Sequence, residues 1–143
     1  MEHDDINIRM DRQREILAEE HRDPFVITFF TFANQEIYGF IAKGSTGFSK
    51  YGLDIIAAAV STLTINAVNS INEFTDDRPE VDMGRNYMKC IILEKVSRDS
   101  QILLRSLRLG MEDIQRSYGE QYLVIEEIRV EKNGIDIVGE ETR

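Results

Sequence analysis

One stretch decides the fold of this chain, residues 44–74, which read GSTGFSKYGLDIIAAAVSTLTINAVNSINEF. It opens with three glycines within nine residues, a density typical of a loop. Residues 53–74 then predict one helix, because their apolar side chains recur every three or four residues. The expected apolar stripe consists of Ile56, Val60, Leu63, Ala67, Ile71 and Phe74. A glycine loop therefore leads directly into a long amphipathic helix.

The segments before this stretch predict a β-hairpin. Residues 25–33 are rich in aromatic and β-branched side chains, which favour a strand. Residues 36–43 alternate their side chains between two faces, as a second strand does. The pair Asn34-Gln35 provides a turn between the two strands.

The segments after the helix predict further strands. Residues 75–86 are polar and predict a loop that can include a short extended piece. Residues 87–96 and residues 121–130 predict the third and fourth strands. An Asn-Gly pair at 133–134 favours a hairpin, so we expect residues 135–138 to form a short fifth strand.

A second helix is predicted between the third and fourth strands. Ser97 or Asp99 can cap its start, and the helix runs to Tyr118 with Gly119 as the C-terminal stop. Its expected apolar stripe consists of Leu103, Leu107, Met111, Ile114 and Tyr118.

This ββαβαβ(β) order predicts an α+β fold with two helices on one face of a mostly antiparallel or mixed sheet. We expect three parts along the chain. Residues 1–24 form an acidic, partly helical tail, residues 25–130 form one α+β domain, and residues 131–143 form a hairpin and a second acidic tail.

The charge balance excludes several classes of function. The 143 residues carry 17 Lys plus Arg and 26 Asp plus Glu, for a net charge of −9. Residues 1–24 alone carry eight acids and four arginines, and residues 131–143 carry four acids and two bases. Such a chain repels phosphate backbones, so we expect no direct nucleic-acid partner. No run approaches 18 apolar residues, so we expect no membrane span, and the single cysteine favours the cytoplasm.

The glycine loop and the start of the helix carry a recognisable motif. It reads Gly-Ser-Thr-Gly at residues 44–47 and YGLDIIAAAVS at residues 51–61. The motif resembles the signature of the Prp (YsxB-like) ribosomal-processing cysteine protease family. That signature is Gly-His-x-Gly, a short loop, then Tyr-Gly-x-Asp-Ile-Val-Cys-Ala-Ala-Val-Ser. The resemblance extends over residues 25–125. It implies a small α+β homodimer that trims the N-terminal extension of a large-subunit ribosomal protein with a Cys–His dyad.

This chain departs from the family at the dyad. The family's His position is Ser45 and its Cys position is Ala57, with the family's spacing of 12 residues. A methyl group is no nucleophile, and a serine cannot replace the imidazole base, so we predict that the chain does not cleave peptides by the family mechanism. Asp54 can either cap the helix or shape the peptide site, and Ser61 can either pack against its neighbours or lie in the cleft. The residues expected to shape a peptide site are Gly44, Ser45, Gly47, Tyr51, Gly52, Asp54, Ala57 and Ser61.

Other side chains are weak replacements for the dyad. Cys90 lies within a predicted strand, where a free cysteine is usually a small buried apolar group. His3 and His21 lie in the acidic tail, and we expect them to be exposed. A pair of Ser45 with Lys50 has chemical precedent but rests on one loop lysine. The sequence shows no spacing typical of a metal site or a nucleotide loop, so we predict no metal and no cofactor.

Three hypotheses about function remain. The first is an inactive member of the family that binds a peptide, such as the ribosomal-protein extension, or an active relative. The second is a genuine Prp cysteine protease whose catalytic residues were substituted at Ser45 and Ala57. The third is a dimeric interaction protein without enzymatic activity, whose acidic ends bind basic surfaces.

Overall fold

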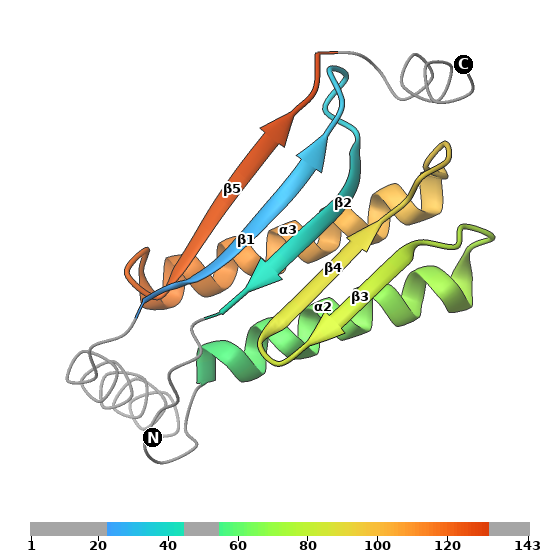
Figure 1. The fold of residues 1–143 in the computed structure, drawn as a ribbon. Coiled ribbons are helices and arrows are strands. Elements are labelled where there is room, and N and C mark those ends of the chain that lie inside the picture. Colours follow the sequence, from blue (N-terminus) through green and yellow to red (C-terminus); the bar gives the residue numbers. More distant parts are fainter. Residues whose placement is uncertain (1–22, 45–54, 132–143) are drawn as a thin grey trace, which may run out of the picture.

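A computed structural model describes residues 23–44 and 55–131 of the chain (Figure 1). These residues form five strands and two helices. In chain order the elements are β1 (Phe25–Thr31), β2 (Ile37–Lys43), α2 (Ile55–Phe74), β3 (Glu80–Gly84), β4 (Tyr87–Ile91), α3 (Arg98–Tyr118) and β5 (Leu123–Arg129).

The strands form one mixed sheet in the order β3-β4-β2-β1-β5. Only the β1–β5 pair is parallel, and the other three pairs are antiparallel. Figure 1 shows both helices behind the same face of this sheet, with α3 behind β1 and β2 and α2 behind β3 and β4. The predicted α+β architecture, two helices on one face of a mixed sheet, is confirmed.

The first hairpin follows directly from its sequence. Along β1 the residues alternate between buried and half-buried positions, so Ile27 and Phe29 face the helices. The Asn34 side chain accepts a hydrogen bond from the Glu36 N–H at 3.0 Å. Gln35 adopts a positive φ of 71°, as a tight turn requires. The predicted turn at Asn34-Gln35 is therefore where the chain reverses.

The buried face of α2 is rotated relative to the predicted stripe. Its buried residues include Thr64 and Val68, whereas Leu63 is only partly buried and Phe74 is 71% exposed. Thr64 tolerates burial because its hydroxyl donates a hydrogen bond to the Val60 carbonyl at 2.8 Å. Leu63 lies instead against Gly110 of α3, where a Cβ would come within 2.9 Å of the Leu63 Cδ1 atom. This rotation follows from the contact between α2 and α3, which the apolar pattern of α2 alone cannot show.

A polar cluster fixes the start of α3. Ser97 is the N-cap, and its hydroxyl accepts a hydrogen bond from the Ser100 N–H at 3.1 Å. The Asp77 carboxylate accepts bonds from the Ser97 N–H at 3.0 Å and the Ser97 hydroxyl at 2.7 Å. Partial burial opposes the charge of Asp77, but the hydrogen bonds from Ser100 and Ser97 and the nearby Arg78 charge hold its pKa below the usual value. The cluster therefore ties the segment after α2 to α3.

The ends of α3 and its packing agree largely with prediction. Gly119 ends the helix with a φ of 110° and donates its N–H to the Gln115 carbonyl, as predicted for a glycine stop. The fully buried leucine is Leu104, whereas the predicted Leu103 is only partly buried. The Gln101 side chain both accepts from and donates to the Ile37 backbone, at 2.9 and 2.8 Å, which joins α3 to β2.

The predictions about the later strands have different outcomes. The short extended piece expected within residues 75–86 is the edge strand β3, residues 80–84, which pairs with β4 although all five of its residues are exposed. The strand predicted over 87–96 ends at Ile91. The fifth strand expected at 135–138 lies outside the described residues, as do nearly all of the two predicted tails. Among the described residues, α2 is long and apolar enough to cross a membrane, a criterion that core helices of globular domains also meet, and its buried apolar residues belong to the hydrophobic core.

Candidate functional site

Gly44 fixes the point at which the chain leaves β2 toward the motif loop. Its N–H donates a hydrogen bond to the Asn86 carbonyl at 2.8 Å, which ties it to the β3–β4 turn. The ring of Phe25 occupies the space that a Cβ on Gly44 would need. Only glycine therefore fits between this ring and the Asn86 backbone.

The other border of the motif loop is the first turn of α2. Ala57 and Ser61 are half-buried and one helical turn apart, so they lie on one side of the helix, and Ile65 continues this row. Ser61 and Ile65 line a cavity of about 60 Å³ between α2 and the β3–β4 hairpin. The cavity is also lined by Phe25, Ala42, Val60, Thr64, Met83, Gly84, Asn86, Tyr87 and Met88.

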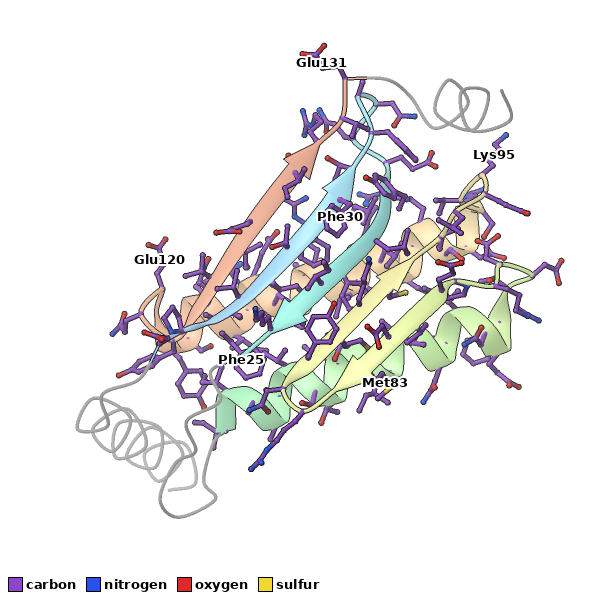
Figure 2. All side chains as sticks on the ribbon, viewed as in Figure 1. Phe25, Phe30, Met83, Lys95, Glu120 and Glu131 are labelled. Atoms are coloured by element: carbon purple, nitrogen blue, oxygen red, sulfur yellow. The ribbon has the colours of Figure 1, made fainter. Side chains whose placement is uncertain are left out.

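This cavity lies at the end of the sheet where the motif loop leaves and returns. Figure 2 shows Phe25 and Met83 together at that end, whereas Lys95 and Glu131 lie at the opposite end. The lining combines apolar side chains with polar side-chain groups from Ser61, Thr64, Asn86 and Tyr87. Such a site suits a small apolar side chain of a peptide, with hydrogen bonding at its rim.

Cys90, which carries the chain's single thiol, does not line this cavity. Cys90 is fully buried on the helix-facing side of β4, where it pairs with Phe40 of β2 and Val81 of β3. Burial raises the pKa of the Cys90 thiol to about 12, so it stays protonated at neutral pH. The prediction that Cys90 is a buried apolar group is confirmed, and it cannot supply a thiolate.

The described residues contain neither a catalytic pair nor a metal site. Both histidines of the chain, His3 and His21, fall within 1–22, outside the described part. Within 23–44 and 55–131 no three His, Cys, Asp or Glu side chains gather as metal ligands would. Of the predicted site residues, the structure describes Gly44, directly after β2, and Ala57 and Ser61, in the first two turns of α2. The others lie outside the described residues: Ser45, Gly47, Tyr51, Gly52 and Asp54.

The structure adds residues that the motif does not predict. Met83, Gly84 and Asn86 come from the β3–β4 hairpin, which the sequence suggested only as a loop. Asn86 has a positive φ of 52°, a conformation in which asparagine is enriched. In the sequence, Asn86 after Gly84 indicates a turn at this point, but it does not show which helix the turn contacts.

The family model for the cysteine protease Prp matches residues 26–123, which is more than half of the chain and includes every residue that lines this cavity except Phe25. The chain belongs to the Prp cysteine protease family. The match covers the positions of Ser45 and Ala57.

Curated relatives and solved structures agree with this assignment. The ribosomal processing cysteine proteases Prp of two Staphylococcus aureus strains are 24% identical over 82 residues, which cover 56% of this chain and 77% of theirs. A crystal structure of Prp from S. aureus with a covalently linked product peptide superimposes with a TM-score of 0.67 at 17% identity. It covers 73% of this chain and 99% of the S. aureus chain. A Streptococcus mutans protein has a TM-score of 0.65 at 24% identity, covering 76% and 100% of the two chains. The fold is therefore that of Prp.

Proposed function

We propose that this chain is a cytoplasmic, catalytically inactive Prp-family protein that binds a peptide. The observation that carries the proposal is Ala57, a methyl side chain on the first turn of α2, at the position to which the resemblance assigns the family's nucleophile. The chain's single thiol, Cys90, is buried in the sheet with its pKa raised to about 12. Proteolysis by a cysteine needs an accessible thiolate and a base within reach, and this chain offers neither at the motif.

The expected ligand is a peptide with a small aliphatic side chain. Two features support this choice, the apolar cavity beside Ser61 and the peptide-bound structures of S. aureus Prp, one with a product peptide and one with a substrate peptide. A volume of about 60 Å³ suits an aliphatic side chain better than an aromatic ring. The N-terminal extension of a large-subunit ribosomal protein is the first candidate, and a segment of an active relative is the second.

The binding test is a fluorescence-anisotropy titration with a labelled peptide matching that extension, followed by mass spectrometry of the mixture. We expect saturable binding and an intact peptide. Ser61→Phe should block binding by filling the cavity, whereas Thr62→Phe, on the exposed side of the same helix turn, should leave it unchanged. Cleavage by the purified chain would refute the inactive assignment. Equal binding by both variants would refute this cavity as the site.

A restoration experiment tests the chemistry separately. Ala57→Cys alone should remain inactive, because no imidazole stands at the family's second position to activate the thiol. Ser45→His combined with Ala57→Cys should recover measurable cleavage, since the spacing of the two positions equals that of the family. Activity of the single variant would show that another group of this chain acts as the base.

A homodimer is the second candidate, supported by the open face of the sheet. No helix of the described residues covers this face (Figure 1), and Phe30 at its centre is half-buried and close to Tyr38, with ring centroids 5.9 Å apart. Ile128 on the same face is 52% exposed. We expect sedimentation to show a dimer that Ile128→Glu dissociates. Leu93→Glu, at a comparably exposed position beyond β4, is the matched control. A monomer in the unmodified chain would refute this candidate.

A further inference from the structure

The outer side of α3 carries a groove far from the cavity at Ser61. Two adjoining hollows of about 680 and 840 Å³ share Ile102 and Arg105 and run between α3, the β1–β2 turn and the segment before α3. We call this surface the α3 groove. It lies at the end of the sheet where Lys95 and Glu131 are found in Figure 2.

The α3 groove combines unpaired cations with exposed aliphatic side chains. Lys95, Arg98 and Arg105 line it and form no ion pair or hydrogen bond with the described part of the chain. Ile102 is 53% exposed and Leu109 is 57% exposed on the same side of α3. Cations and exposed aliphatic side chains therefore share one side of α3, on a chain whose net charge is −9.

The other arginines of the α3 groove are already neutralised. Arg108 lies 3.5 Å from the Glu112 carboxylate and 3.0 Å from that of Glu127, and Arg129 lies 2.9 Å from Glu127. Near Arg98 and Arg105 the one lining acid is Glu36, so this half of the groove keeps an excess of positive charge. The α3 groove is therefore complementary to an acidic segment that carries aliphatic side chains.

The chain carries such a segment in residues 1–8, MEHDDINI. Three acids, Glu2, Asp4 and Asp5, occur there without any Lys or Arg, and Ile6 and Ile8 follow. We propose that this segment docks on the α3 groove of its own molecule. The carboxylates face Arg98 and Arg105, and the two isoleucines cover Ile102 and Leu109.

The length of intervening chain is compatible with docking within one molecule. The structure begins at Asp23, next to the start of β1, and the groove lies near the far end of this strand (Figure 1). Seven residues of strand span about 20 Å. The 18 residues from Asp5 to Asp23 reach about 27 Å if wholly helical and about 59 Å if fully extended, so either conformation covers this distance. A tether that matches its span gives an effective concentration near millimolar, which favours the same molecule over a second copy.

The test is paramagnetic relaxation enhancement on the full chain. A nitroxide attached through Ser106→Cys labels the groove selectively, because Cys90 is buried and its thiol pKa is raised to about 12. We expect most of the amide signal of residues 2–8 to be lost, and to return at about 1 M salt, where the screening length falls to about 3 Å. A label attached through Thr62→Cys, on the exposed side of α2, should leave these signals unchanged.

Two further experiments test the docking, one with charge-reversal variants and one with a mixture of isotope-labelled and spin-labelled chains. Arg98→Glu with Arg105→Glu should restore the signals of residues 2–8, and Lys43→Glu with Lys89→Glu on the open sheet face should not. Mixing isotope-labelled, unmodified chain with unlabelled, spin-labelled chain should give no effect. Unaffected signals in the spin-labelled chain would overturn the proposal. An effect in the mixed sample would also overturn it, because the segment would then dock on a second copy. None of these results bears on peptide binding at the Ser61 cavity.

Discussion

Replacing Gly44 with alanine should destabilise the domain and close the cavity beside Ser61. The added methyl overlaps the ring of Phe25, which is buried, while the Gly44 N–H remains bonded to the Asn86 carbonyl. Overpacking of this kind costs about 1–3 kcal/mol. The reduced freedom of alanine in the unfolded chain returns about 0.4–1 kcal/mol. The net loss of about 1–2 kcal/mol should lower Tm by about 3–8 °C for a chain of this size.

Peptide binding at the cavity is the second property that Gly44→Ala should change. Phe25 lines it, so the most direct relief of the overlap moves the ring into the space of about 60 Å³. Gly44→Ala should therefore weaken peptide binding as well as stability. Calorimetric melting and the anisotropy titration measure the two effects. Gly84→Ala is the control for stability, because a Cβ there meets only the Tyr87 Cβ, at 3.9 Å. Equal Tm values for the two variants would refute the argument that the Phe25 ring requires glycine at 44.

Three further outcomes follow from the described structure. Cys90 should react with a thiol reagent only at the rate of global unfolding, because it is fully buried and its pKa is raised to about 12; rapid labelling of the folded chain would contradict its placement. Leu104→Ala should cost about 2–5 kcal/mol, clearly more than Leu103→Ala, since Leu104 is the fully buried member of the pair; urea unfolding that ranked them in reverse would contradict the orientation of α3. The pKa of Asp77 is lowered on folding, so its contribution to stability is complete above the unfolded-state pKa and is lost as pH falls through the folded-state value. Asp77→Asn should therefore lower stability at neutral pH and flatten its acid dependence, and parallel curves for the two proteins would count against this role.

Local sequence patterns were sufficient to predict elements whose ends are marked by residues of the same segment. The first hairpin followed from side-chain alternation and a turn pair at Asn34. The boundaries of α3 followed from Ser97 and Gly119, which cap the two helix ends, although the Asp77 carboxylate also accepts hydrogen bonds from the Ser97 N–H and hydroxyl. The motif at 44–61 led to the family, which the match over residues 26–123 confirmed.

Patterns were insufficient where contacts beyond one segment decide the outcome. The expected short extended piece at residues 80–84 becomes the strand β3 because it pairs with β4, and the pattern did not show this pairing. The α2 stripe placed Leu63 inward, yet Gly110 of α3 leaves room for this side chain at the helix–helix contact, and Thr64 takes the buried position. Both decisions depend on surfaces that come together only in the folded domain.

The sequence by itself determined the fold class and the family, and it led to the prediction that Ser45 and Ala57 replace the family's catalytic residues, because each of these depends on residue identity and spacing along the chain. The tertiary structure alone decided that Phe25, Ser61 and Met83 share one cavity, and that unpaired cations line the outer side of α3. The physical reason is that burial, overlap and charge pairing depend on distances in space between segments that the chain order leaves far apart.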